Sequence, residues 1–135
     1  DKSKIWVVSG RYKGIKGAAP TYSPQLLLRG ELQKDGVVDI PMQASFNVLV
    51  YVLEGSLKTG DGQLLTKDMG VYNLDGEKVE LMATADTRYI LLSGEPIKEP
   101  IAQYGPFVMN NQTQLMEAVR DSQMGKMGIL IEEFD

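Results

Sequence analysis

The chain has 135 residues, of which 43% are hydrophobic and 24% are charged, a composition typical of a single globular domain. Its formal net charge of −4, from 14 basic and 18 acidic residues, argues against the basic surface that nucleic-acid phosphates require. The absence of cysteine and histidine excludes disulfides, thiolate metal sites, cysteine nucleophiles and histidine bases.

Three Asp-Gly pairs, at Asp35-Gly36, Asp61-Gly62 and Asp75-Gly76, punctuate the first two thirds of the chain. Asp and Gly tolerate the positive φ of tight turns, so each pair predicts a turn. The predicted strands are Ile5–Val8, Gln25–Leu32, Val37–Pro41, Asn47–Leu53, Gln63–Thr66, Gly70–Leu74, Lys78–Thr84 and Thr87–Leu92. Short strands at such close spacing indicate an antiparallel sandwich or barrel.

Two of these strands carry a more specific expectation. Asn47–Leu53 is apolar at successive positions, which is typical of a strand in the middle of a sheet and covered on both faces. The only tryptophan, Trp6, lies in the first strand, and we interpret it as a core residue.

The hydrophobic period changes to that of a helix after Pro106. Asn111 is suited to cap a helix, and Gln114 could return the hydrogen bond as in a capping box. Leu115, Ala118 and Val119 then fall on one side, and Gly125 with Lys126 is a stop signal. The pattern predicts one helix, at residues 111–125, with a narrow apolar stripe suited to docking.

The most distinctive segment runs from Leu91 to Asn110. It holds two Glu-Pro pairs, Glu95-Pro96 and Glu99-Pro100, followed by Tyr104-Gly105-Pro106-Phe107. This string closely resembles the C-terminal signature of the pirin family, whose members are built from two cupin β-barrels in tandem. The rest of the chain resembles only the second of those barrels.

The resemblance implies a mainly β fold: a cupin-type antiparallel β-sandwich or jelly-roll barrel with one C-terminal helix. We therefore expect a single cupin domain over residues 1–135. Within it, we expect the barrel at 1–92, the signature segment at 93–110, the helix at 111–125 and a tail at 126–135.

Pirins with an iron centre carry it in the first barrel, in a motif of the form His-Pro-His-Arg-Gly-Phe-Glu before a strand that ends in Leu-Glu-Gly. Counting back from Leu53-Glu54-Gly55 places Pro41 and Gln43 where the two histidines would be. Proline cannot ligate through its side chain, and glutamine is a weak neutral donor. We expect no metal, no cofactor and no catalytic residue in this chain, with a carboxylate-only cation site near Asp75 and Glu77 as the alternative.

Aromatic side chains suggest two other kinds of site. Phe46, Tyr51, Tyr72 and Tyr89 are candidates to line a cavity for a flat apolar ligand, although side chains ordinarily fill small barrels. The Glu-Pro pairs restrict the backbone of Ile97–Phe107 to extended conformations. We expect that segment to lay Tyr104, Phe107 and Met109 against an apolar surface, as a candidate interface.

The resemblance implies a structural and interaction role. The chain would be a metal-free cupin half that packs against an N-terminal cupin domain of the same protein, or against its mate in a homodimer. The alternative is a small-molecule-binding or quercetin 2,3-dioxygenase-like cupin whose metal site is supplied by an N-terminal domain outside this chain.

Some pirins show quercetin 2,3-dioxygenase activity, and animal members act as transcriptional cofactors. The iron residues have no counterpart here, so neither activity is expected of this chain alone. No apolar run approaches the roughly 20 residues that span a bilayer. We expect a cytoplasmic protein that binds neither nucleic acid nor membrane.

Overall fold

The structure is a computed structural model that describes residues 2–60, 62–73 and 75–128. The chain divides into two compact units, Asp1–Pro96 and Ile97–Asp135, each with its own secondary structure. Three predicted features lie partly outside the described residues: a turn at Asp61, a strand that ends at Leu74, and the tail, of which residues 129–135 are not described.

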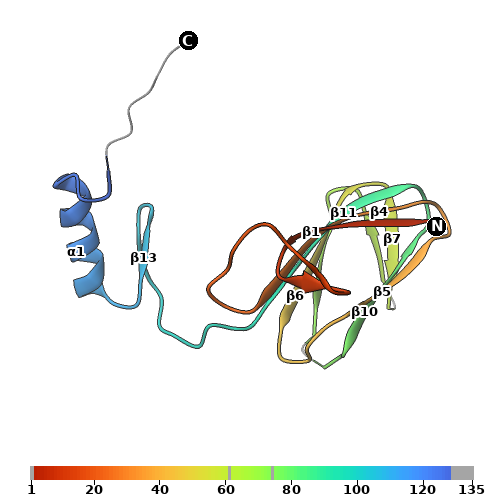
Figure 1. The fold of residues 1–135 in the computed structure, drawn as a ribbon, viewed down its shortest axis with the longest axis horizontal. Helices are drawn as coiled ribbons and strands as arrows, with labels where there is room; N and C mark the ends of the chain where they lie inside the picture. Colours follow the sequence, from red (N-terminus) through yellow and green to blue (C-terminus); the bar gives the residue numbers. More distant parts are fainter. Residues whose placement is uncertain (1, 61, 74, 129–135) are drawn as a thin grey trace, which may run out of the picture. The chain divides into compact units, whose positions relative to one another are not determined.

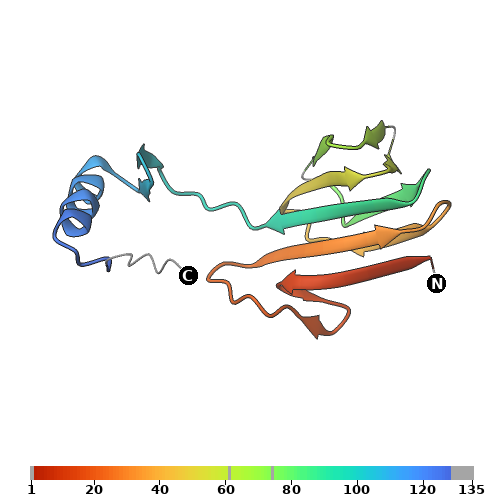
Figure 2. The ribbon, with the colours of Figure 1, turned by 90° about the horizontal axis from the view of Figure 1, so that it is seen from above.

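The first unit is built from two antiparallel sheets (Figures 1 and 2). The five-stranded sheet has the order β1 (Ser3–Ser9), β4 (Gln25–Leu32), β11 (Thr87–Gly94), β6 (Asn47–Glu54) and β9 (Met69–Tyr72). The four-stranded sheet has the order β5 (Val37–Pro41), β10 (Lys78–Ala83), β7 (Ser56–Thr59) and β8 (Gly62–Leu65). A two-stranded ribbon, β2 (Arg11–Tyr12) with β3 (Ile15–Lys16), follows β1. This arrangement confirms the cupin-type sandwich; the two sheets do not close into a continuous barrel.

The core lies between the two sheets and follows the two-residue period of the strands. From the five-stranded sheet, Leu28, Val50 and Leu91 are completely buried. Ile40 and Leu81 are completely buried from the four-stranded sheet. All of them belong to one hydrophobic cluster, which fixes the register of both sheets because a one-residue slip would turn every core side chain outward.

All eight predicted strands are present, and those at Gln25–Leu32 and Val37–Pro41 have the predicted bounds. Asp35 has a φ of 62°, as its turn requires, and this turn joins the two sheets rather than two strands of one hairpin. The sequence pattern predicted neither β2, β3 and β7 nor the two short strands of the second unit. Each has no more than four residues, too few for an alternating pattern to stand out.

The second unit contains a hairpin and a helix. β12 (Ala102–Tyr104) pairs with β13 (Phe107–Met109), and Gly105 supplies the positive φ of their turn. The expectation that Ile97–Phe107 is extended throughout is therefore wrong, because the chain reverses at Gly105-Pro106. The helix α1 (Gln112–Gln123) confirms the predicted one: the Asn111 side chain accepts a hydrogen bond from the Gln114 backbone N–H at 3.0 Å. The Gln114 side chain accepts one from Asn110, one residue before the cap. Within the described ranges, no helix is long and apolar enough to cross a membrane.

Candidate functional site

The two residues expected at metal-ligand positions, Pro41 and Gln43, lie at one end of the sandwich. Pro41 ends β5, and Gln43 follows it in the loop to β6, where its backbone carbonyl accepts a hydrogen bond from Phe46 at 2.9 Å. Neither side chain offers the imidazole nitrogen that iron prefers. These residues do not fit a centre of three histidines and one carboxylate.

The carboxylates do not replace that centre. Asp39 and Glu80 are both bound by Lys78 Nζ, at 2.7 and 3.5 Å, on the surface of the four-stranded sheet. Glu54 pairs with Arg88. Among the residues described, no group of three or more acidic, histidine or cysteine side chains is placed to hold a metal ion.

The four aromatic candidates for a cavity lie in three different environments. Phe46 and Tyr72 line a small pocket beside the loop from β5 to β6. Tyr72 donates to or accepts from Thr59 at 2.6 Å, and burial raises its pKa although that hydrogen bond opposes the rise. Tyr89 is completely buried, with its ring over Gly30. Tyr51 lies between the inward-facing Val50 and Val52, so it faces away from the core.

The outward side of the five-stranded sheet carries two parallel rows of mostly apolar side chains, which together we call the outer face. Strand register places Leu27, Leu92, Leu49 and Val71 side by side in the first row. It places Trp6, Arg29, Ile90, Tyr51 and Met69 side by side in the second. Both rows cross the sheet that Figure 2 shows from above.

This arrangement corrects two expectations about burial. The strand at Asn47–Leu53 is an interior strand of the sheet, as expected, although it lies next to the edge strand β9. Only one of its faces is buried within the unit: Leu49 and Tyr51 are half-buried and Leu53 is exposed. Trp6 is not a core residue, because its neighbours Ile5 and Val7 take the inward positions. Its ring is instead contacted by two cations, Arg29 at 4.8 Å and Lys4 Nζ at 4.7 Å from the ring centroid.

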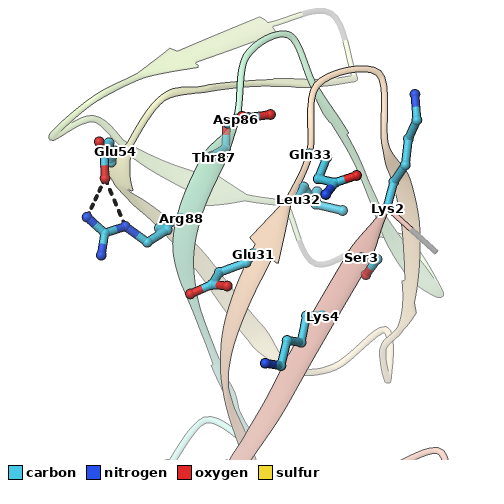
Figure 3. A pocket seen from close by; sticks show the side chains of 10 residues that line it. All are labelled: Lys2, Ser3, Lys4, Glu31, Leu32, Gln33, Glu54, Asp86, Thr87 and Arg88. Atoms are coloured by element: carbon cyan, nitrogen blue, oxygen red, sulfur yellow. Dashed lines mark hydrogen bonds and ion pairs between the residues drawn. The ribbon is translucent and has the colours of Figure 1, made fainter.

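A charged row borders the outer face at one end. Register places Lys4, Glu31, Arg88 and Glu54 across four adjacent strands, with alternating charge. Figure 3 shows these side chains around a pocket of about 470 Å³, with Arg88 hydrogen-bonded to Glu54. Glu31 is also bound by Arg29, at 3.0 Å. Because both glutamates of the row are exposed and paired with arginines, this depression is better suited to the rim of an interface than to catalysis.

The three candidate interface residues all lie in the hairpin of the second unit. Tyr104 pairs with Phe107 in register, and Met109 pairs with Ala102. Tyr104 is exposed, whereas Phe107 and Met109 are half-buried. Tyr104 also lines a groove of about 380 Å³ along α1, together with Leu115, Met116 and Val119.

The outer face is the feature that reasoning from the sequence missed as a site. The sequence does contain a signal for this face, because β6 and β11 carry apolar residues at outward as well as inward positions. The same pattern is typical of a strand that is buried on both sides within its own chain.

The family model for the pirin C-terminal cupin domain matches residues 27–128. A Pseudomonas aeruginosa protein named as a candidate quercetin 2,3-dioxygenase is 32% identical over 91% of this chain and 43% of its own length. A pirin-like protein of Arabidopsis thaliana is 33% identical over 90% of this chain and 42% of its own length.

Among solved structures, the chain is similar to a crystal structure of quercetin 2,3-dioxygenase from Acinetobacter baumannii. The TM-score is 0.87 and the identity 37%, over 96% of this chain and 45% of that one. The chain thus spans less than half the length of each of these three proteins.

Proposed function

We propose a function from one established premise: the chain belongs to the pirin family and is a C-terminal cupin domain of that family. Its proposed role is structural. It is a metal-free cupin half that packs, through its outer face, against an N-terminal cupin domain that supplies any metal chemistry.

The observation that carries this proposal is the apolar outer face. A sheet with one solvated face ordinarily alternates apolar inward residues with polar outward ones. Here Leu92 and Val71 are 40% and 72% exposed, and Leu27, Leu49 and Ile90 lie between or beside them. An apolar patch that crosses five strands and ends in a charged row has the anatomy of an interface core with a polar rim.

The companion we assign to this face is a second cupin domain. Full-length relatives of a pirin C-terminal domain carry one on the N-terminal side. The outer face is broad and nearly free of charge apart from Arg29, which stacks on the ring of Trp6 and pairs with Glu31. Such a face suits another sheet better than a flexible acidic or basic peptide.

The second unit supports the same role by itself. Its hairpin and helix leave Tyr104, Val108 and Met116 exposed, and the groove along α1 is apolar at Leu115 and Val119. We propose that Tyr104, Phe107 and Met109 form part of the interface with the N-terminal domain. Aromatic residues and methionine are enriched at the centres of such interfaces.

The proposal that the domain holds no metal rests on which side chains are available as metal ligands. Pro41 and Gln43 stand at the ligand positions, and the chain has no histidine. Metal analysis of protein purified without a histidine tag tests it. We expect no stoichiometric transition metal after dialysis; one equivalent of iron, nickel or manganese that survives dialysis would overturn this part.

The interface is tested with a chimaera in which this chain replaces the matching C-terminal half of the Acinetobacter baumannii protein. Leu92→Glu should lower the free energy of unfolding of the chimaera by about 2 kcal/mol or more, because it buries a charge in the interface. In the chain alone it should cost about 1 kcal/mol or less.

Val37→Glu is the matched control, because Val37 is also an exposed apolar residue but belongs to the four-stranded sheet. Val37→Glu should lower the free energy of unfolding by the same amount in the chimaera and in the chain alone. Equal effects of Leu92→Glu in the two proteins would contradict the proposal. So would a dimer of the chain alone that Leu92→Glu dissociates, since the face would then join two copies.

A further inference from the structure

A pocket of about 290 Å³ opens at the end of the sandwich where β4 and β6 begin and β5 and β11 end. It belongs entirely to the first unit and is separate from the outer face. Leu26 and Phe46 form an apolar part of its lining, and Arg11, Gln43 and Ser93 bring polar groups to it. A concave apolar site with a few convergent polar groups is the usual form of a small-molecule site.

Ser93 is the most informative of these residues. Its side chain is only 8% exposed, and its hydroxyl has no hydrogen-bond partner among the residues that the structure describes. Thr87, another buried hydroxyl residue on β11, is fully engaged: its Oγ1 accepts from the Ser56 N–H at 2.9 Å and is placed to donate to the Ser56 carbonyl at 3.0 Å. A buried hydroxyl without a partner costs free energy, so Ser93 calls for a partner from outside the protein.

Two other buried hydroxyls, on Tyr12 and Tyr89, also lack partners in the described chain. Neither lines this pocket. Of these three residues with unpartnered buried hydroxyls, Ser93 is therefore the one that lines the pocket.

Arg11 determines the charge of the pocket. One of its guanidinium nitrogens donates to the Gly14 carbonyl at 3.2 Å, which leaves most of its five N–H donors free. No carboxylate of the described residues pairs with it, and no acidic residue lines the pocket. A local positive charge in a chain of net charge −4 favours an anionic ligand.

We propose that this pocket binds a small organic carboxylate. The carboxylate accepts hydrogen bonds from the Arg11 guanidinium and the Ser93 hydroxyl, and Gln43 also lines the pocket. The organic part of the ligand lies against Leu26 and Phe46. Guanidinium and carboxylate form strong charge-assisted hydrogen bonds, and the apolar lining disfavours a bare inorganic anion. This site does not depend on the proposed interface.

The probe is benzoate, and the control ligand is benzamide, which has nearly the same shape but no charge. Amide NMR spectra of the full chain should show saturable shifts at Arg11, Gln43 and Ser93 with benzoate, with a Kd of about 1 mM or tighter for so small a ligand. Benzamide should bind about 10-fold more weakly or worse, because it loses the charge-assisted bonds.

Two variants and one control complete the experiment. Arg11→Gln should weaken benzoate binding about 10-fold or more. Ser93→Ala should weaken it about 3-fold to 10-fold and leave the unfolding midpoint unchanged or raised, since an unpartnered hydroxyl is removed. Lys13→Gln removes a cation from the same β2–β3 ribbon, but Lys13 does not line the pocket. This control substitution should leave the affinity for benzoate unchanged.

The proposal is overturned by an absence of saturable shifts at these residues, by equal affinity for benzoate and benzamide, or by full binding in both Arg11→Gln and Ser93→Ala. Ser93 would in those cases be satisfied by water. If Arg11→Gln fails to fold, Ser93→Ala alone decides the outcome.

Discussion

The two faces of the five-stranded sheet are both apolar, but only one of them is buried within this chain. Leu28, Val50 and Leu91 on the inner face are completely buried against the four-stranded sheet. Leu27, Leu49 and Leu92, which alternate with them on the same strands, are half-buried or exposed. We infer that apolar residues on both faces of these strands mark two faces to be covered, one within the chain and one, on our proposal, by a second domain.

The adjacent residues Leu91 and Leu92 provide the largest expected difference between the two faces. Leu91→Ala should lower the free energy of unfolding by about 2–5 kcal/mol, because it opens a cavity in the core. Leu92→Ala should cost about 1 kcal/mol or less in the chain alone, because its side chain is already partly in water. Urea unfolding of both variants measures this, and equal losses would show that the outer face is covered within the chain.

The inner face should also resist added volume. A Cβ at Gly30 would lie 2.2 Å from Cζ of Tyr89, far inside van der Waals contact. Gly30→Ala should therefore cost about 1–3 kcal/mol by overpacking. Gly62→Ala is the control, since the nearest atom to its Cβ would be 3.7 Å away. If thermal unfolding shows both variants to be as stable as the wild type, the close packing of Tyr89 over Gly30 is wrong.

Tyr89 gives the smallest effect, and it depends on pH. Burial raises the pKa of Tyr89 above its ordinary value near 10, and the neighbouring Tyr12 adds to the rise. The native state then keeps a proton that the unfolded chain loses. The contribution of Tyr89 to stability is complete below about pH 10 and falls by roughly 1.4 kcal/mol per pH unit above it.

Tyr89→Phe should remove this part of the alkaline loss of stability and have little effect at neutral pH, because the hydroxyl has no partner to lose. Unfolding free energies at about pH 8 and about pH 11 measure the slope. A variant with the same alkaline slope as the wild type would show that Tyr89 is accessible to solvent in the folded chain.

Much of the fold followed from local signals in the sequence. Asp35-Gly36 marked a turn, alternation marked β4 and β5, and Asn111 with Gly125 marked the ends of the helix. The short strands β2, β3 and β7 did not follow, because each has no more than four residues and shows no alternating pattern. Only β7 also depends on a distant partner, β10.

The sequence shows the identities of Pro41 and Gln43 directly, and the expectation of a metal-free domain rests on them. A surface cannot be read from the sequence in this way. Trp6 and Tyr51 looked like interior residues, and only strand register showed that they share a row on the outer face. Nothing in the sequence pointed to Ser93, because a serine near the end of a strand is common. Its burial and its lack of a partner among the described residues are visible only in the structure.

The central claim, that the outer face is an interface for a second cupin domain, is tested most directly by methionine oxidation. Met69 lies in the second row of the outer face and is 57% exposed; Met82 is 38% exposed and lies on β10 of the four-stranded sheet. Mild peroxide should oxidise both in the chain alone, since susceptibility follows exposure. In the chimaera with the N-terminal half of the Acinetobacter baumannii protein, mass spectrometry should find Met69 protected and Met82 as reactive as before. Oxidation of Met69 at the same rate in both proteins would contradict the claim.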